Sequence, residues 1–217
     1  MPRPLRIIVS GVSVHVFQRG HNRADVFADS TDKAWFLAFL EAAAGAQGLD
    51  VHAYALMSNH YHLLGTPSDE GALSRTMHQC NSRFGRYYNA RHSRTGTLWG
   101  GRFRSVVMRE ERQWLTCLRY VEQNPVRAHI VDAAEDYQWS SYRVHAFGAP
   151  PDWLVPHPVY VGLGPTPSDR QAAYKQLCGE LVDEHELVVQ RLGESSGARH
   201  VPGTCLAPVG GRARRPG

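Results

Sequence analysis

Two short apolar segments flank Ser58-Asn59 in residues 51–66, whose sequence is Val-His-Ala-Tyr-Ala-Leu-Met-Ser-Asn-His-Tyr-His-Leu-Leu-Gly-Thr. Both segments are rich in β-forming residues and lie between residues that break regular structure. We therefore predict strands over Val51–Met57 and His60–Thr66, joined tightly into an antiparallel hairpin.

The segments on both sides of this hairpin have strand and helix patterns. Residues 7–18 alternate apolar with small or polar residues, as a strand does, and residues 31–48 have helical spacing with Ser30 or Thr31 able to cap the start. Downstream, we expect a helix over residues 72–89, a strand from residue 105 and a helix over residues 112–123. The last helix should stop near Asn124, because Pro125 disfavours helical geometry in the residue before it.

The composition is that of a globular chain with a moderate basic excess. The 217 residues are 42% hydrophobic, carry a net charge of +4 and have a pI near 9.0. Nearly all basic residues are arginine, whose planar guanidinium suits phosphate, although a high-GC coding sequence would also favour arginine. We find no apolar run of about 18 residues and no convincing signal-peptide cleavage site, so we expect a cytoplasmic location. The cysteines form no Cys-x-x-Cys pair and fit a reducing compartment; they are Cys80, Cys117, Cys178 and Cys205.

Two histidines on the second strand of the hairpin are candidate metal ligands. Residues two apart on a strand project from the same face about 6.6 Å apart, so His60 and His62 could share one metal ion. A His-x-His pair taken alone is more often a packed or solvated pair on a sheet face. The decision depends on which residues lie nearby.

Tyr120 and Asn124 lie at the end of the helix predicted over residues 112–123. A separation of four residues puts them on one helical face, about 5 to 6 Å apart between Cβ atoms. A tyrosine hydroxyl has an ordinary pKa near 10, so a cation on the scissile phosphate would help it as a nucleophile, and an amide oxygen could join the ligands. Taken alone, a tyrosine such as Tyr120 is more often a core tyrosine with its hydroxyl at the surface, and an asparagine such as Asn124 is more often a helix terminator before proline.

Two arginine-rich stretches are candidates for holding a nucleic-acid backbone, with aromatic residues available for base stacking. Solvated loops with Trp99 tucked into the core are the alternative. The candidate DNA-binding residues are Arg19, Asn22, Arg23, Arg94, Trp99, Arg102, Phe103 and Arg104.

Taken together, ordered sequence blocks resemble those of REP-associated tyrosine transposases, relatives of the single-tyrosine HUH transposases that mobilise insertion sequences through single-stranded DNA. The resemblance spans most of residues 1–142. The blocks are Met1-Pro-Arg-Pro-Leu-Arg6, Val14-His-Val-Phe-Gln-Arg-Gly-His-Asn-Arg23, His52-Ala-Tyr-Ala-Leu-Met-Ser-Asn-His-Tyr-His-Leu-Leu64, Arg94-Thr-Gly-Thr-Leu-Trp-Gly-Gly-Arg-Phe-Arg-Ser105, Arg119-Tyr-Val-Glu-Gln-Asn-Pro-Val-Arg-Ala128 and Tyr137-Gln-Trp-Ser-Ser-Tyr142.

This resemblance implies a ferredoxin-like α+β HUH domain with a central antiparallel sheet and packed helices. It implies a divalent metal, Mg²⁺ or Mn²⁺, at His60 and His62, with Tyr120 as the nucleophile and Asn124 as the third ligand; zinc remains an alternative. Similar proteins cut single-stranded DNA beside imperfect palindromic hairpins, leaving a 5′-phosphotyrosine and a free 3′-hydroxyl, and related transposases are homodimers. A hairpin-binding protein without cleavage activity and a nuclease for structured RNA remain alternatives.

The resemblance weakens after Phe147, where the sequence pattern also changes. We predict a catalytic domain over residues 1–147 and a helical extension over residues 148–194, with one amphipathic helix over residues 168–191. Residues 195–217 are rich in Gly, Pro and Arg and are predicted to be a disordered tail.

Overall fold

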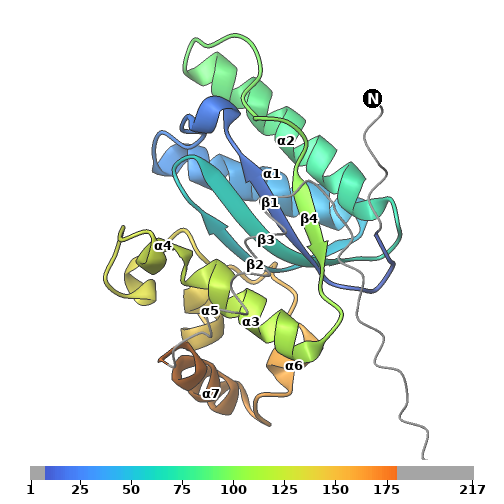
Figure 1. The fold of residues 1–217 in the computed structure, drawn as a ribbon, viewed down its shortest axis with the longest axis vertical. Coiled ribbons are helices and arrows are strands. Elements are labelled where there is room, and N and C mark those ends of the chain that lie inside the picture. Colours follow the sequence, from blue (N-terminus) through green and yellow to red (C-terminus); the bar gives the residue numbers. More distant parts are fainter. Residues whose placement is uncertain (1–7, 180–217) are drawn as a thin grey trace, which may run out of the picture.

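The computed structural model describes residues 8–179, which fold around a four-stranded antiparallel sheet (Figure 1). Its strands are β1 (Val14–Arg19), β2 (Leu49–Leu56), β3 (His60–Pro67) and β4 (Arg104–Val107), in the spatial order β2-β3-β1-β4. The predicted hairpin is β2–β3, and the α+β fold class with a central antiparallel sheet is confirmed. The first strand is shorter than predicted, because Gly11 adopts a positive φ of 73° in a turn before Val14.

Two long helices cover one face of the sheet. They are α1 (Ser30–Gln47) and α2 (Ala72–Arg91), close to the bounds predicted for both. The predicted cap of α1 was wrong by one residue: Asp29 has extended backbone geometry and its carboxylate accepts from the Asp32 backbone N–H at 3.1 Å. A carboxylate there also interacts favourably with the helix dipole.

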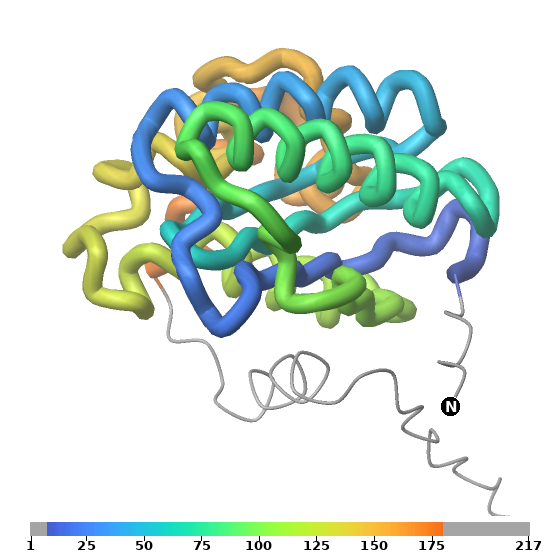
Figure 2. The backbone as a smooth tube through the Cα atoms, turned by 90° about the horizontal axis from the view of Figure 1, so that it is seen from above, coloured from blue at the N-terminus to red at the C-terminus, as the bar shows by residue number. Residues whose placement is uncertain are grey.

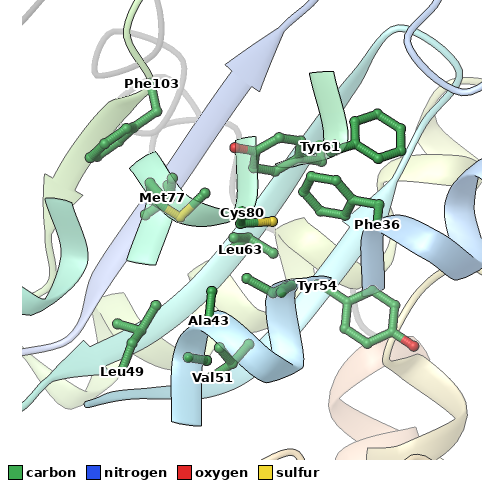
Figure 3. Close-up of a cluster of buried hydrophobic side chains, with 14 of the residues drawn as sticks. Phe36, Ala43, Leu49, Val51, Tyr54, Tyr61, Leu63, Met77, Cys80 and Phe103 are labelled. Carbon is green, nitrogen blue, oxygen red and sulfur yellow. The ribbon is translucent and has the colours of Figure 1, made fainter. Parts of the chain in front are cut away.

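The space between the sheet and these two helices is filled by apolar and aromatic side chains. Figure 3 shows Phe36 beside Tyr61, with Leu63, Met77 and Cys80 in the same cluster. The Phe36 and Tyr61 rings have centroids 4.7 Å apart. This continuous core fixes the sheet against α1 and α2.

The opposite face is covered by shorter helices from the second half of the chain (Figures 1 and 2). Cluster residues Tyr160 and Tyr174 pack with Leu118 in a second core against the sheet. These helices are α3 (Glu111–Glu122), α4 (Asn124–Arg127), α5 (Tyr142–Phe147), α6 (Pro158–Val161) and α7 (Pro167–Gly179). The described residues also form two 3₁₀ turns: η1 (His21–Arg23) follows β1, and η2 (Ala134–Asp136) precedes α5. None of the described helices is long and apolar enough to cross a membrane.

The sequence predicts the break after α3 but not the short helix beyond it. The helix ends at Glu122, and Asn124 then opens α4 with Pro125 in its first turn, where a missing N–H costs nothing. α7 matches the start of the helix predicted over residues 168–191; the rest of that prediction and the tail over residues 195–217 lie outside the described residues. The division at residue 147 stays a prediction.

Candidate active site and family

Three histidines gather on the sheet face that α3 covers. In the antiparallel pairing of β1 and β3, Phe17 lies opposite His62 and Arg19 lies opposite His60, so alternation also brings His15 to this face. The His60 and His62 ring centroids are 5.1 Å apart. His15 Nε2 and His62 Nδ1 are hydrogen bonded at 3.0 Å, with the two rings stacked at an interplanar angle of 6°.

Tyr120 reaches the same place from α3. Its ring stands edge-on to His62, at a centroid distance of 5.6 Å and an angle of 89°, and to His15 at 6.0 Å and 84°. The Arg127 guanidinium lies over the Tyr120 ring at 5.7 Å. The structure therefore brings together the tyrosine and the two histidines that the sequence singled out, although they are about 60 residues apart in the chain.

Hydrogen bonds fix the orientation of His60. Its Nδ1 lies 2.6 Å from Asn59 Oδ1, which can only accept, so His60 donates from Nδ1 and carries its lone pair on Nε2. Asn59 is itself held, because its amide nitrogen donates to the Arg23 carbonyl at 3.1 Å. An outer partner that sets the tautomer of a histidine in this way is typical of metal sites.

Burial keeps these histidines neutral. It lowers the pKa of His60 to about 4, with the Arg19 charge adding to the effect, and it lowers the pKa of His15 to about 4. The pKa of His62 is lowered well below its usual value by burial first and then by its neighbours His15, His60 and Arg19. Neutral imidazole is the form that binds a metal.

The donor set at this site suits a divalent cation only if an amide oxygen takes part. Within residues 8–179, no three His, Cys, Asp or Glu side chains form a group that could hold a metal ion. Asn124 lies one helical turn beyond Tyr120, and its amide nitrogen approaches the Tyr120 carbonyl at a long 3.5 Å. That contact assigns the other amide atom of Asn124 as oxygen, a ligand type that Mg²⁺ and Mn²⁺ accept alongside imidazole, and its place as the third ligand stays a prediction.

Comparison with known proteins decides the family. The family model of IS200-like transposases matches residues 8–124, which contain the sheet, both histidines, Tyr120 and Asn124. The chain belongs to this family. Family membership assigns it a DNA transposition role.

One solved structure agrees with this fold. The structure of a REP-associated tyrosine transposase bound to a REP hairpin is similar with a TM-score of 0.55 and 15% identity, over 72% of this chain and 93% of that chain. A candidate transposase from Deinococcus radiodurans R1 is 16% identical over 59% of this chain and 95% of that chain, with a TM-score of 0.40. No curated protein matches the chain.

Two residues that touch or support the site of this IS200-like transposase were not predicted from the sequence. His15 was overlooked because its contact with His62 depends on the register of β1 against β3, although a histidine in an apolar strand was a signal. Glu122, fully buried and two residues after Tyr120, gave no signal beyond its charge.

The Glu122 carboxylate ties α3 to the helices around it. It accepts hydrogen bonds from the Ser141 hydroxyl, from His145 Nδ1 at 2.7 Å and from the Tyr174 hydroxyl at 2.5 Å. Burial and the nearby Glu122 charge raise the pKa of Tyr174 well above its usual value, so it stays a donor. These bonds position the end of α3 that carries Tyr120.

The two arginine-rich stretches of the transposase lie side by side at one end of the sheet. The His21 N–H donates to the Leu98 carbonyl and the Gly100 N–H to the Arg19 carbonyl, both at 2.9 Å, so residues 98–100 pair with the end of β1. Figure 2 shows this loop (green) against the turn after β1 (blue). Asn22 and Arg23 in that turn both have positive φ, at 52° and 61°.

The sheet divides the candidate DNA-binding residues between its two faces. Arg104 pairs with Phe17 and so shares the His62 face, where Arg19 also lies. Trp99 and Phe103 pack on the opposite face, in or against the core under α1 and α2. The four remaining candidates are exposed. They are Asn22 and Arg23 in the turn after β1, Arg94, whose guanidinium lies over Tyr88 at 5.6 Å, and Arg102 in the loop before β4.

Proposed function

We propose that this IS200-like transposase is a metal-dependent endonuclease and strand transferase for single-stranded DNA. It cleaves beside DNA hairpins, with Tyr120 as the nucleophile. The observation that carries the proposal is the edge-on contact of Tyr120 with His62, which joins a hydroxyl to a pair of neutral histidines in one site.

In the proposed reaction the Tyr120 hydroxyl oxygen attacks the scissile phosphorus. The bond between the phosphorus and the 3′ oxygen breaks, and that oxygen gains a proton while the tyrosine hydroxyl loses one. The DNA on the 5′ side stays joined to the enzyme as a phosphotyrosine. The phosphodiester energy is preserved, so a free 3′-hydroxyl can reverse the step and join a new strand without ATP.

His60, His62 and Asn124 would hold the divalent metal, Mg²⁺ or Mn²⁺. A bound cation would polarise the scissile phosphate and stabilise the charge that develops on it. His60 already presents Nε2 through its bond to Asn59. His62 presents Nε2 in the tautomer in which its Nδ1 donates to His15 Nε2, so His15 sets the orientation of a ligand.

The basic residues at the end of the sheet would hold the DNA backbone. Arg19 and Arg104 flank Phe17 on the His62 face and are placed for phosphates near the scissile bond, and Asn22, Arg23, Arg94 and Arg102 would extend the contact. The partner is single-stranded DNA with a REP-like hairpin, an assignment supported by the similar structure described as bound to a REP hairpin. A homodimer is the proposed assembly.

Covalent capture tests this function. Purified protein is mixed with hairpin-bearing single-stranded DNA and Mg²⁺ or Mn²⁺, and a denaturing gel reports the protein–DNA adduct. We expect an adduct from the wild type, none from Tyr120→Phe, none from the His60→Ala/His62→Ala variant and none with EDTA. Tyr142→Phe, a tyrosine of the same face outside the site, is the matched control and should form the adduct.

Other outcomes favour other activities. Tight hairpin binding with no adduct would indicate a DNA-binding protein without cleavage activity. Cleavage of structured RNA that Tyr120→Phe leaves intact would replace the mechanism with that of a hydrolytic nuclease.

A further inference from the structure

The short helix beyond α3 places a positive charge beside the candidate nucleophile. α3 ends at Glu122, Asn124 opens α4, and Arg127 is the last residue of α4 (Figure 1). The Arg127 guanidinium lies over the Tyr120 ring, 5.7 Å from its centroid, which is within the range in which a cation and an aromatic ring attract each other. Arg127 therefore touches the candidate active site, and the proposed function assigns it no part.

The backbone of α4 holds Arg127 in a defined position. The Arg127 N–H donates to the Gln123 carbonyl at 3.0 Å. The Ala128 N–H donates to the Asn124 carbonyl at 2.9 Å, and Pro125 restricts the first turn. Residues three apart in a helix lie on one face, so Arg127 starts from the same face of α4 as Asn124, the candidate third ligand.

The Arg127 charge has no counterion within residues 8–179. No carboxylate in this range forms an ion pair or a hydrogen bond with its guanidinium. Glu122, five residues before it, is fully buried and accepts from three residues of α5 and α7 instead, which are Ser141, His145 and Tyr174. Arg127 is only partly exposed, and a partly buried arginine without a counterion is suited to binding an anion.

The proposed reaction needs positive charge at this place. When the Tyr120 oxygen attacks, further negative charge develops on the non-bridging oxygens of the phosphate, and donors already in position stabilise it. The candidate metal ligands His60, His62 and Asn124 are neutral and so offset none of this charge themselves. A guanidinium carries a full charge and a planar fork of N–H donors that matches phosphate oxygens.

We propose that Arg127 is a catalytic residue that binds the scissile phosphate. Its N–H groups donate to a non-bridging oxygen as Tyr120 attacks, and they keep this contact in the phosphotyrosine and in the reverse, strand-joining step. Arg127 transfers no proton, because a guanidinium stays charged in proteins. The inference rests on the proposed function, since it assigns a residue to the same reaction.

Single-turnover kinetics of adduct formation test this role. Arg127→Met keeps an unbranched apolar side chain but removes the charge and the donors, and it should slow adduct formation on hairpin-bearing single-stranded DNA by about 10²–10³-fold. Arg127→Lys keeps the charge without the fork, so its rate should lie between those of the wild type and Arg127→Met. Arg143→Met, at an exposed arginine of α5, is the matched control and should react at the wild-type rate.

Sulfur substitution separates phosphate binding from a packing role. The scissile phosphate is prepared with sulfur in place of one non-bridging oxygen, as two separate diastereomers. Sulfur at the oxygen that Arg127 contacts should slow the wild type, and this extra slowing should be absent in Arg127→Met. The diastereomer whose slowing Mn²⁺ relieves relative to Mg²⁺ reports a metal contact instead, and its slowing in Mg²⁺ should persist in the variant.

Binding and folding are measured separately. Fluorescence anisotropy in EDTA should show that Arg127→Met loses much less affinity than rate, because the contact strengthens as charge develops on the phosphate. Near-ultraviolet circular dichroism reports the fold, which should be retained because Arg127 is partly exposed. If Arg127→Met does not fold, Arg127→Lys with the same two diastereomers decides the question.

The proposal is overturned if folded Arg127→Met forms the adduct at the wild-type rate, or if each diastereomer is slowed equally in the wild type and the variant. The second result would assign Arg127 to packing against Tyr120. No adduct from the wild type would reject the proposed function and this inference together. A wild-type adduct whose rate Arg127→Met matches would reject this inference alone.

Discussion

The two faces of the sheet are packed by opposite means. Under α1 and α2 the core is a continuous set of aliphatic and aromatic side chains around Phe36 and Leu40. Under α3 the core is interrupted by buried polar groups, among them His15, His62 and Glu122. A fully buried carboxylate lies on each face, but Asp32 of α1 is paired with the Arg91 charge, whereas Glu122 is held by Ser141, His145 and Tyr174.

This difference indicates that apolar packing and buried hydrogen bonds have different roles in the protein. Apolar packing supplies stability without fixing any one polar atom, because dispersion and the hydrophobic effect have little directionality. Hydrogen bonds to buried groups fix direction but contribute modest net stability. Apolar packing on both faces is therefore expected to supply stability, and the buried polar groups of the α3 face are expected also to determine the geometry at Tyr120.

Truncation of a core leucine on each face should separate these roles with the largest effect. Leu40→Ala and Leu118→Ala each remove a fully buried side chain, and each should lower the free energy of unfolding by about 2 to 5 kcal/mol in urea titrations. Leu40→Ala should leave adduct formation per folded molecule unchanged. Leu118→Ala, two residues from Tyr120, should reduce it.

Equal losses of adduct formation in the two folded variants would contradict the different roles that we assign to the two faces of the sheet. The comparison requires a temperature at which both variants are folded, checked by near-ultraviolet circular dichroism. The two leucines serve as controls for each other, because the chemistry removed is the same.

The buried carboxylates provide a second, smaller test. Glu122→Gln keeps the shape of the side chain but leaves one of three donors without an acceptor, which should cost about 1 to 3 kcal/mol of unfolding free energy. It should also slow adduct formation in the folded protein, because one of the hydrogen bonds that hold α3 against α5 and α7 is lost. Asp32→Asn is the matched control on the other face and should cost stability without slowing the reaction.

An unchanged adduct rate in folded Glu122→Gln would mean that Glu122 is structural only. Rescue provides a further check. If the loss arises from the unpaired Tyr174 donor, adding Tyr174→Phe to Glu122→Gln should restore part of the stability.

The strands and helices were predictable because their patterns are local. Alternation in residues 51–66 marks β2 and β3, and helical spacing marks α1 and α2, so their bounds were predicted to within a few residues. The two exceptions have local causes as well. Asp29 replaces Ser30 as the cap of α1, and α4 begins directly after the break that Pro125 imposes.

The contacts that build the site were only partly predictable. His60 and His62 share a face by strand geometry alone, and the approach of Tyr120 to them followed from the family resemblance. His15 required the register of two strands 47 residues apart, and Glu122 required donors that arrive 19 to 52 residues later in the chain. A charged residue at the end of a helix is ordinarily exposed, so its sequence context suggested solvent.

Lowering the pH should reduce the stability of the protein, first through histidines that pack on the α3 face. This is the smallest effect that we expect. Burial, with a contribution from nearby His52, lowers the pKa of His157 to about 4, and burial lowers the pKa of His52 despite its bond to the Val155 carbonyl. Both contact Trp114 of α3. Between pH 6.5 and about 4 the unfolded chain binds protons that the folded chain does not, so stability is present above this window and is lost as the pH falls.

Urea titrations between pH 7 and pH 5 should therefore show a falling free energy of unfolding, by at most about 1.4 kcal/mol per pH unit for each such histidine. His157→Gln removes one of these groups and should make the slope shallower, whereas His78→Gln, at an exposed position of α2, should not. If both variants leave the slope of unfolding free energy against pH unchanged, the acid sensitivity arises from other groups. The two faces would then not differ in their response to acid.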